Sequence, residues 1–350
     1  MGKHVLLTGG VGFLGHHVVE HFLKNTDWTV TIIDRLNYAG NQNHLTDLKI
    51  WPQEGLRVNF VFHDFRAEFT GATLDMVSKP HPDYIIHMGA ESHVDNSIRD
   101  PRPFVESNVT GTLNLLELAR KLQPEKFLYV STDEVYGPAR VLRRGAPGTA
   151  EWRRPELHLH KEGEPFRPSN PYSASKAGAE ALCYSFWNTY GLPILTTNTM
   201  NLIGQRQSPE KFVPKTVRAI LRDEPVTIHV KKVDGQIVDI SSRCWLHARN
   251  YADAALWLLR NATSYGQSFN IVGEWADCEM MVDRIGAILG RADVDKRFED
   301  FHSFRPGHDL HYGLDGSKMA ALGWKAPYSL QDSLEHTIKW MQDNPRWLLL

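Results

Sequence analysis

A glycine-rich turn between an apolar run and a helical stretch constrains the fold of this chain most strongly. The apolar run HVLL leads directly into TGGVGFLG, which contains Gly9, Gly12 and Gly15. The first glycine permits a tight turn, the second lets the backbone approach a pyrophosphate, and the third lets helix and strand pack closely. The helix that follows directs N–H groups and the positive end of its dipole at such an anion. The pattern therefore predicts a dinucleotide site at the first strand of an α/β fold.

An acidic residue at the end of the second predicted strand indicates which dinucleotide would bind. Asp34 closes the run TVTIID, 34 − 15 = 19 residues after Gly15. A carboxylate there suits the two ribose hydroxyls of NAD and repels the extra phosphate of NADP. Arg35, directly beside it, weakens that exclusion. We therefore predict NAD as the cofactor.

The first half of the chain repeats a short β-branched apolar run followed by an amphipathic stretch. Because the runs show little alternation, they predict parallel strands covered by helices on both faces. The predicted class is α/β, a Rossmann-like doubly wound parallel sheet with a smaller mixed α/β substrate-binding portion on the C-terminal side. The predicted strands are His4–Thr8, Thr29–Asp34, 58–63, Tyr84–His87, 126–131 and Ile194–Thr199, and the predicted helices are 12–25, 70–79, 101–122 and 172–189.

The pattern of predicted helices and strands changes near residue 200. Residues 1–200 are expected to form the NAD-binding domain, with 138–170, rich in Pro, Gly, Arg and His, as a loop excursion. Residues 201–350 are expected to be mainly substrate-binding and interleaved with the first part. Further helices are predicted at 210–222, 251–261, 280–289 and around the apolar stripe Leu330, Leu334, Ile338 and Met341.

Composition and charge exclude several classes of protein. The 350 residues are 42 % hydrophobic and 23 % charged, as in soluble globular proteins. A formal charge of −2 gives no broad field for nucleic acid or an anionic membrane, so neither partner is expected. Three cysteines are too few for a disulfide framework, and no apolar stretch approaches the ~20 residues of a membrane span. With no room for a signal segment before the first strand, we expect a cytoplasmic protein.

The motif YSASK supplies a candidate catalytic pair. Tyr172 and Lys176 are four residues apart on a predicted helix and therefore share a face. A phenol with an ordinary pKa of about 10 is a weak base at neutral pH, so an ammonium and a cationic nicotinamide are needed to stabilise its phenolate. Alone, this spacing more commonly joins a packed aromatic ring to a solvated charge. Together with the glycine turn it favours catalysis.

The motif YVSTDEVYG follows the fifth predicted strand, at the sheet edge where α/β folds bind ligands. Thr132 can hydrogen-bond a substrate oxygen beside Tyr172. Asp133 and Glu134 form a carboxyl pair for acid and base catalysis. An isolated TDE more commonly caps a helix or lies in a solvated turn. Because neighbouring residues of a strand point to opposite faces, both carboxyls can face one ligand only if the strand has already ended.

These motifs resemble those of the nucleotide-sugar 4,6-dehydratases, a family of extended short-chain dehydrogenase/reductases. The similarity spans nearly the whole chain, and TDEVYG discriminates best, because related epimerases and decarboxylases generally lack its Asp-Glu pair. The matching segments are TGGVGFLG, IIDRLNYAGN, HMGAESHVDNSI, NVTGTLNLLE, STDEVYG, PSNPYSASKAGAE, PEKFVP and RPGHD.

The resemblance implies a lyase reaction on an NDP-glucose, with dTDP-glucose expected first and UDP-glucose next. Tyr172, helped by Lys176 and Thr132, takes the proton of the 4-hydroxyl while carbon 4 passes hydride to NAD. Glu134 as carboxylate then abstracts the carbon 5 proton, and Asp133 as neutral acid protonates the departing 6-hydroxyl. Hydride returns to carbon 6, which gives the NDP-4-keto-6-deoxy sugar without net oxidation.

The resemblance also assigns the other site residues and implies a homodimer with no metal. Apolar arcs on the predicted helices 101–122 and 172–189 fit a subunit contact or a core equally well. Besides the glycines, Asp34, Tyr172 and Lys176, the cofactor residues are Phe13, Leu14, Arg35, Asn37, Asp64, Phe65, Met88, Gly89, Ala90, Ser92 and Ser107. Besides Thr132, Asp133 and Glu134, the substrate residues are Ser92, Asn201, Arg243, Asn270, Arg305 and His308.

Three alternatives stay open from the sequence. A 4-epimerase or decarboxylase shares the Tyr-Lys pair but makes no 6-deoxy product, and a dinucleotide-binding regulator keeps the fold without catalysis. A metal enzyme is suggested by 17 histidines, including His158 and His160 in HLH, but no HExxH or comparable carboxylate spacing accompanies them. The segment NLIGQ, and Cys244 in place of an acid, depart from the family pattern where base and sugar are recognised, so the nucleobase stays open.

Overall fold

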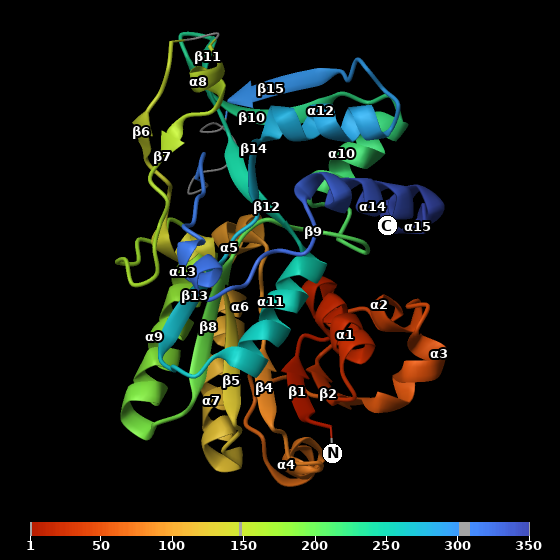
Figure 1. The fold of residues 1–350 in the computed structure, drawn as a ribbon, viewed down its shortest axis with the longest axis vertical. Helices are drawn as coiled ribbons and strands as arrows, with labels where there is room; N and C mark the ends of the chain where they lie inside the picture. Colours follow the sequence, from red (N-terminus) through yellow and green to blue (C-terminus); the bar gives the residue numbers. More distant parts are fainter. Residues whose placement is uncertain (1, 147–148, 301–308, 350) are drawn as a thin grey trace.

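A seven-stranded parallel sheet forms the centre of the computed structural model, which describes residues 2–146, 149–300 and 309–349 (Figure 1). The strand order is β13-β8-β5-β4-β1-β2-β3, and every neighbouring pair is parallel. Reversal of the order at β1 is typical of doubly wound folds and places a crevice at the carboxyl ends of the strands. The strands are β1 (His4–Thr8), β2 (Thr29–Asp34), β3 (Val58–Phe62), β4 (Tyr84–His87), β5 (Lys126–Thr132), β8 (Ile194–Thr199) and β13 (Gln267–Ile271).

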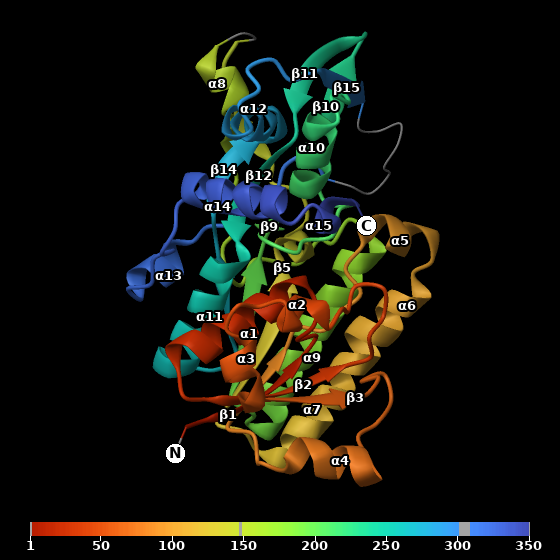
Figure 2. The ribbon, with the colours of Figure 1, turned by 90° about the vertical axis from the view of Figure 1, so that its right-hand side faces the viewer.

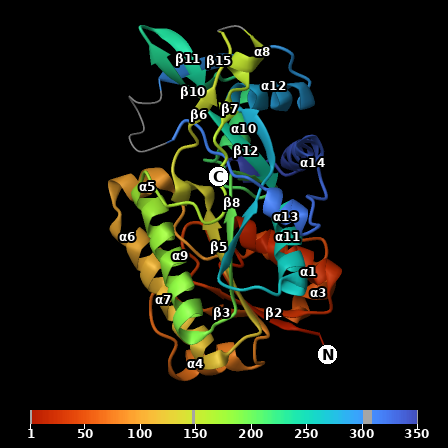
Figure 3. The same ribbon diagram turned by 60° about the vertical axis from the view of Figure 1, so that its left-hand side comes forward.

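Helices cover both faces of this sheet, as the strand pattern predicts. Figure 3 shows α7 (Gly111–Leu122) and α9 (Pro171–Tyr190) on one side, and α1 (Phe13–Asn25) and α11 (Ala248–Asn261) on the other. In β1, Leu6 packs into the core shared with α7, whereas Val5 and Leu7 pack into the core shared with α1 and α11. Each fully buried side chain of this kind contributes roughly 1.5–3 kcal/mol. The predicted fold class is confirmed.

The predicted helix 101–122 is divided into three parts. These are α6 (Arg102–Phe104), a π-helical turn η2 (Val105–Thr110) and α7. Asn108, in the π-helical turn, is buried and donates to the Glu91 carbonyl oxygen and to Ser175 Oγ, both at 2.9 Å. It also accepts from the Glu91 backbone N–H at 2.9 Å. This side chain ties the turn to the loop after β4, which explains why a regular helix does not continue through it.

A smaller unit with two three-stranded sheets lies over the carboxyl edge of the large sheet, in the upper half of Figure 2. Its own core gathers apolar residues of its helices and strands, among them Val217, Ile228, Ile285 and Leu334. Its elements are β9 (Leu202–Ile203), α10 (Phe212–Leu221), β10 (Val226–Val233), β11 (Gln236–Ile240), β12 (Ser242–His247), β14 (Glu274–Asp277), α12 (Cys278–Ile288), β15 (Lys296–Asp300), α14 (Leu330–Asp343) and α15 (Arg346–Leu349).

The two parts of the chain are interleaved, since α11 and β13 come from beyond residue 200 yet join the large sheet and its helix layer. The boundary at residue 200 stays a prediction. The remaining elements are short: α2 (Asn43–Thr46), α3 (Trp51–Glu54), η1 (Gly55–Arg57), α4 (Gly71–Ser78), α5 (Val94–Arg99), η3 (Asp133–Tyr136), β6 (Val141–Arg143), α8 (Ala150–Arg153), β7 (Glu156–Leu157) and α13 (Ser317–Ala321). None of the helices in the described part of the chain has the length and apolar character needed to cross a bilayer.

Candidate active site

A cavity of about 530 Å³ lies where the carboxyl ends of the central strands meet the smaller unit. Its wall includes most of the residues that the sequence places at the cofactor, and among the described residues only Asp64 of that set is missing from it. The predicted residues that line it are Gly9, Gly12, Phe13, Leu14, Gly15, Asp34, Arg35, Asn37, Phe65, Met88, Gly89, Ala90, Ser92, Ser107, Thr132, Asp133, Glu134, Tyr172, Lys176 and Asn201.

The glycine turn at the floor of this cavity has no room for larger side chains. Gly9 has a φ of +74°, and a Cβ on it would lie 2.8 Å from the Gly89 Cα. A Cβ on Gly15 would lie 2.0 Å from the Gly9 carbonyl oxygen, so the first turn of α1 packs directly on the β1 turn. A Cβ on Gly12 would meet only that carbonyl, at 3.2 Å. The space in front of Gly12, at the N-terminus of α1, is thus open for an anion.

Asp34 ends β2 beside this turn and is buried. Its Oδ1 accepts from the Leu36 backbone N–H at 2.9 Å. Burial raises the pKa of this carboxyl, and hydrogen bonds from the backbone oppose the rise. Because each carboxylate oxygen can accept more than one hydrogen bond, Asp34 can still accept from a pair of ribose hydroxyls.

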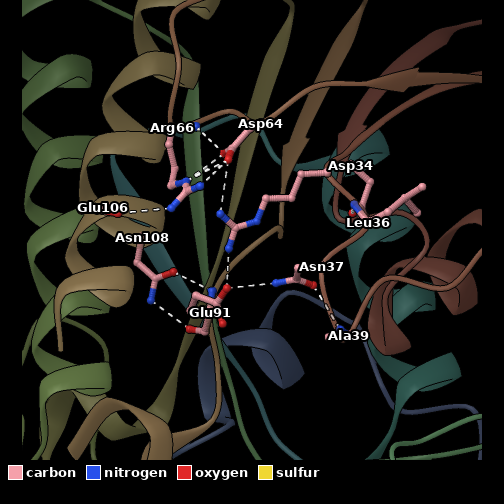
Figure 4. Close-up of polar contacts among 10 residues, drawn as sticks. Asp34, Leu36, Asn37, Ala39, Asp64, Arg66, Glu91, Glu106 and Asn108 are labelled. Atoms are coloured by element: carbon pink, nitrogen blue, oxygen red, sulfur yellow. Dashed lines mark hydrogen bonds and ion pairs between the residues drawn. The ribbon is translucent and has the colours of Figure 1, made fainter. Parts of the chain in front are cut away.

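Arg35 is held by carboxylates and is not free to bind a phosphate. Its guanidinium donates to Glu91 and, at 3.4 Å, to Asp64 Oδ2. Figure 4 shows how the neighbours share these acids: Arg66 donates to Asp64, at 2.6 Å for the shortest contact, and Asn37 Nδ2 donates to Glu91 Oε1 at 2.9 Å. These ion pairs reduce the positive charge that Arg35 presents beside Asp34, which favours NAD over NADP.

Strand β5 ends at Thr132, and the carboxyl pair lies in the 3-10 turn η3 that follows. The Glu134 backbone N–H donates to Thr132 Oγ1 at 3.4 Å, and Thr132 Oγ1 donates to Asp133 Oδ1 at 3.1 Å. Asn170, which caps α9, donates from Nδ2 to Glu134 Oε2 at 2.9 Å. Because the strand has ended, both carboxyls can lie in one cavity wall. Within a strand, by contrast, the alternation of side chains would place them on opposite faces of the sheet.

The two carboxyls have different tendencies to ionise. Burial, and after it the charge of Glu134, raises the pKa of Asp133 to about 8, although the hydrogen bond from Thr132 opposes the rise. Burial also raises the pKa of Glu134, but the hydrogen bond from Asn170 stabilises its ionised form. Burial, with the charge of Glu134 added to it, thus favours a neutral Asp133, while the hydrogen bond from Asn170 favours an ionised Glu134. One carboxyl can accept a proton while its neighbour can donate one.

Tyr172 and Lys176 line the same cavity from the first turns of α9. Lys176 Nζ donates to the Val130 carbonyl oxygen at 2.7 Å, and burial lowers its pKa to about 8. Burial and the charge of Glu134 raise the pKa of Tyr172, and a hydrogen bond with Thr132 opposes the rise. Tyr172 thus needs additional positive charge nearby before it can act as a base.

Two residues predicted at the substrate do not line the cavity, within the part of the chain that the structure describes. Arg243 donates to the carbonyl oxygens of Ser242 and Leu310, at 2.7 and 2.6 Å. Asn270 is fully buried and donates from Nδ2 to the His160 carbonyl oxygen at 3.0 Å. Their donors hold loops together here, so the substrate roles of both residues stay predictions, although the Arg243 charge opposes the rise that burial causes in the pKa of Asp133 and of Glu134. The other two, Arg305 and His308, lie outside the described residues.

Several residues that line the cavity were not predicted from the sequence. Arg206 is buried, and its guanidinium lies 4.9 Å from the ring centroid of Trp340. Lys211 belongs to the segment PEKFVP, which carried part of the family resemblance without a residue being singled out. His44 and Trp347, whose rings stack 5.0 Å apart, come from distant parts of the chain, and no local pattern marks them.

The fold and this site define an extended short-chain dehydrogenase/reductase, in which a cofactor turn, a Tyr-Lys pair and an acid-base pair share one cavity. The comparison with protein-family models agrees. The chain belongs to the GDP-mannose 4,6 dehydratase family, whose model matches residues 6–337. The resemblance stated from the motifs is thereby confirmed.

Individual relatives narrow the comparison. The dTDP-glucose 4,6-dehydratase of Salmonella typhimurium is 36 % identical, with 98 % of this chain and 94 % of that protein covered. A crystal structure of the dTDP-glucose 4,6-dehydratase DesIV from Streptomyces venezuelae, with NAD bound, is similar with a TM-score of 0.81 and 30 % identity over 99 % of this chain and 98 % of that one. A UDP-N-acetylglucosamine 4-epimerase from Methanobrevibacter ruminantium reaches a TM-score of 0.79 at 25 % identity, over 98 % and 99 % of the two chains.

Proposed function

We propose that this protein is an NAD-dependent nucleotide-sugar 4,6-dehydratase, which converts an NDP-glucose to the NDP-4-keto-6-deoxy-glucose. One observation carries the proposal: Asp133 and Glu134 line one cavity beside Tyr172, where Thr132 donates to Asp133 and Asn170 donates to Glu134. An epimerase or a decarboxylase needs no acid to expel a hydroxyl, whereas a dehydratase needs an acid and a base together. The dehydratase relatives support the same conclusion.

The residues of the cavity fit NAD. A Cβ at Gly9 or Gly15 would collide with backbone, and the open space before Gly12 lies at a helix N-terminus, as a bound pyrophosphate requires. Asp34 would hold the ribose hydroxyls of the adenosine half. When bound, NAD supplies a two-electron acceptor that oxidises carbon 4 and gives the electrons back at carbon 6.

The Tyr172 phenolate takes the proton of the 4-hydroxyl in this scheme. The Lys176 ammonium and the positive charge of a bound nicotinamide would lower the pKa of Tyr172, which burial and Glu134 raise. Thr132, which hydrogen-bonds this phenol, orients the same sugar oxygen. The ketone formed at carbon 4 acidifies the hydrogen on carbon 5.

Glu134 accepts the carbon 5 proton, and Asp133 gives its proton to the departing 6-hydroxyl. The bond from carbon 5 to its hydrogen and the bond from carbon 6 to oxygen break, a double bond forms between these carbons, and water leaves. Asn170 keeps Glu134 ionised and oriented through its 2.9 Å hydrogen bond. Hydride returns to carbon 6, Glu134 gives a proton back to carbon 5, and the proton that Tyr172 took from the 4-hydroxyl is released as Asp133 regains one, so the cycle closes without net oxidation.

Among nucleotide sugars, dTDP-glucose is the first substrate to test and UDP-glucose the next. The experiment supplies dTDP-glucose, UDP-glucose, GDP-mannose and UDP-N-acetylglucosamine separately, with NAD at the concentration of the protein, and follows the product by mass spectrometry. The expected product has lost one water, and Asp133→Asn abolishes the loss while Asp75→Asn, at an exposed carboxylate of α4, leaves it unchanged. A product of unchanged mass would instead identify an epimerase.

A cytoplasmic homodimer is the proposed assembly. Apolar side chains of the helices 105–122 and 171–190 are exposed in the single chain, among them Val105, Leu113 and Tyr184. Exposed large apolar side chains on these two helices support a subunit contact. Light scattering at assay concentration is expected to give twice the mass of 39.9 kDa, and a monomer would contradict the dimer.

A further inference from the structure

Two histidines and a glutamate of the 138–170 segment meet outside the active-site cavity. His158, His160 and Glu164 each offer one ligand atom, and these atoms all lie within 4.8 Å of one another. We infer that the three side chains form a binding site for a divalent transition-metal cation with the preferences of Zn²⁺, which holds the stretch 158–164 of this segment in one conformation. Neither the active site nor the family relationship accounts for the cluster.

The donor set and its spacing suit zinc. Imidazole nitrogen and carboxylate oxygen are the ligands that Zn²⁺ takes, at about 2.0–2.2 Å. Tetrahedral bonds of that length hold neighbouring ligand atoms about 3.4 Å apart. In the structure Glu164 Oε2 lies 3.0 Å from His158 Nε2 and 2.8 Å from His160 Nδ1. To admit a cation, the Glu164 oxygen and each of the two histidine nitrogens therefore need to move apart by only a few tenths of an ångström.

The hydrogen bonds around the cluster also fit a metal site. Both rings now direct a nitrogen at the same Glu164 oxygen, so each must place its proton there. When Zn²⁺ takes these two nitrogens, each neutral ring changes tautomer and carries its one proton on the other nitrogen. For His160 that nitrogen, Nε2, lies 3.4 Å from the Pro138 carbonyl oxygen, which can accept it. A backbone acceptor of this kind typically orients a metal-bound histidine.

The cluster is both anchored and accessible. The ring of His160 stacks on Tyr136, with centroids 5.5 Å apart and planes 13° from parallel. The backbone carbonyl oxygen of His160 accepts from Asn270 Nδ2. The side chains of His158 and Glu164 are 31 % and 28 % exposed, against 11 % for His160. One side of the site is therefore rigid, and the other lets an ion enter and leaves room for water as a fourth ligand.

The place of the cluster in the fold suggests what the cation would do. Tyr136 ends the turn η3 that carries Asp133 and Glu134, and the segment returns to the site at Asn170. The cation would connect the two ends of the stretch 158–164, in the middle of the 138–170 segment. Three protein ligands with an open fourth position are usual for catalytic zinc, but this cluster does not line the cavity, so the role we assign to the cation is to hold the loop.

Zinc binding can be measured directly on the full chain, by competition with a chromophoric zinc indicator after treatment with a chelator. Glu164→Gln and His158→Gln each remove one ligand and keep side-chain size. The matched control is His21→Asn, since His21 lies 3.6 Å from Asp253 without a second histidine ligand among the described residues. Wild type and control are expected to bind one Zn²⁺ per chain with equal affinity, and the two variants to bind it at least tenfold more weakly.

Equal affinity and stoichiometry in all four proteins would overturn the inference, because the zinc would then sit on other histidines of the chain. Absence of binding by the wild type would overturn it as well. If both variants fail to fold by circular dichroism, an anomalous zinc peak in crystals of the wild type decides: it lies within bonding distance of the three ligand atoms or the site is refuted. These measurements use no substrate, so their failure leaves the dehydration assay untouched.

Discussion

Replacement of Glu134 by Gln separates the oxidation step from the elimination step. The variant keeps the size of the side chain and its oxygen can still accept from Asn170, which now donates at 2.9 Å. Loss of the charge weakens that hydrogen bond by roughly 1 kcal/mol, and it also removes the desolvation cost that raises the pKa of Glu134. Loss of a positioned base costs about 10²- to 10⁴-fold in rate, or about 3–5 kcal/mol in the activation free energy of proton abstraction. The effect on catalysis therefore exceeds the effect on folding.

The same change has the opposite effect on the first step. The charge of Glu134 is a cause of the raised pKa of Tyr172, so its removal lowers that pKa and makes the phenolate easier to form. Oxidation at carbon 4 is expected to proceed at least as fast as in the wild type. The charge of Glu134 is also a cause of the raised pKa of Asp133, which should fall below its value of about 8 in the variant.

The assay follows substrate in deuterated water. In Glu134→Gln the absorbance of reduced nicotinamide is expected to rise and persist, while uptake of deuterium at carbon 5 falls by at least 10²-fold. Glu117→Gln, at a glutamate of α7 that pairs with Arg120, is the control and should behave as wild type. Deuterium uptake at the wild-type rate in Glu134→Gln would refute the role of this carboxylate.

Three further predictions follow from the site. Tyr172→Phe should lower turnover by about 10²- to 10⁴-fold and leave binding of NAD, measured by titration calorimetry, within about twofold of wild type; wild-type turnover would exclude the phenol as base. Asp34→Ala should weaken NAD binding and lower the ratio of the affinity for NAD to the affinity for NADP. An unchanged ratio would show that Asp34 does not set the cofactor preference. Asp133 has a folded pKa of about 8 against 3.8 in the unfolded chain, so the native state binds more protons between these values and stability falls as pH rises from about 4 to 8. Asp133→Asn lacks this dependence. In urea unfolding, the free energy of unfolding of the variant minus that of wild type should therefore rise between pH 4 and pH 9, and a constant difference would contradict the raised pKa.

The central sheet and the cofactor turn could be predicted because local physics determines them. The apolar run of β1 is buried on both faces, and Gly9 and Gly15 stand where a Cβ would collide with backbone. The carboxyl pair could also be predicted, together with the condition that the strand must end before it. The end of β5 at Thr132 meets that condition.

Residues that depend on contacts distant in sequence could not be predicted. Asn270 was assigned to the substrate by family resemblance, but in this chain it donates to a carbonyl of the 138–170 segment, which no local pattern could indicate. The histidines of that segment were interpreted as loop residues because their spacing matches no zinc motif on a helix. Only the folded chain brings Glu164 onto both rings. Trp347 lines the cavity from the far end of the chain for the same reason.

The most direct test of the account uses nucleotide-glucose labelled with deuterium at carbon 4, converted in ordinary water with NAD at the concentration of the protein. The account predicts a product lighter than substrate by one water, with the label at carbon 6 and no accumulation of reduced cofactor. A label retained at carbon 4, or lost from the sugar altogether, would contradict the claim that carbon 4 is oxidised and its electrons return to carbon 6.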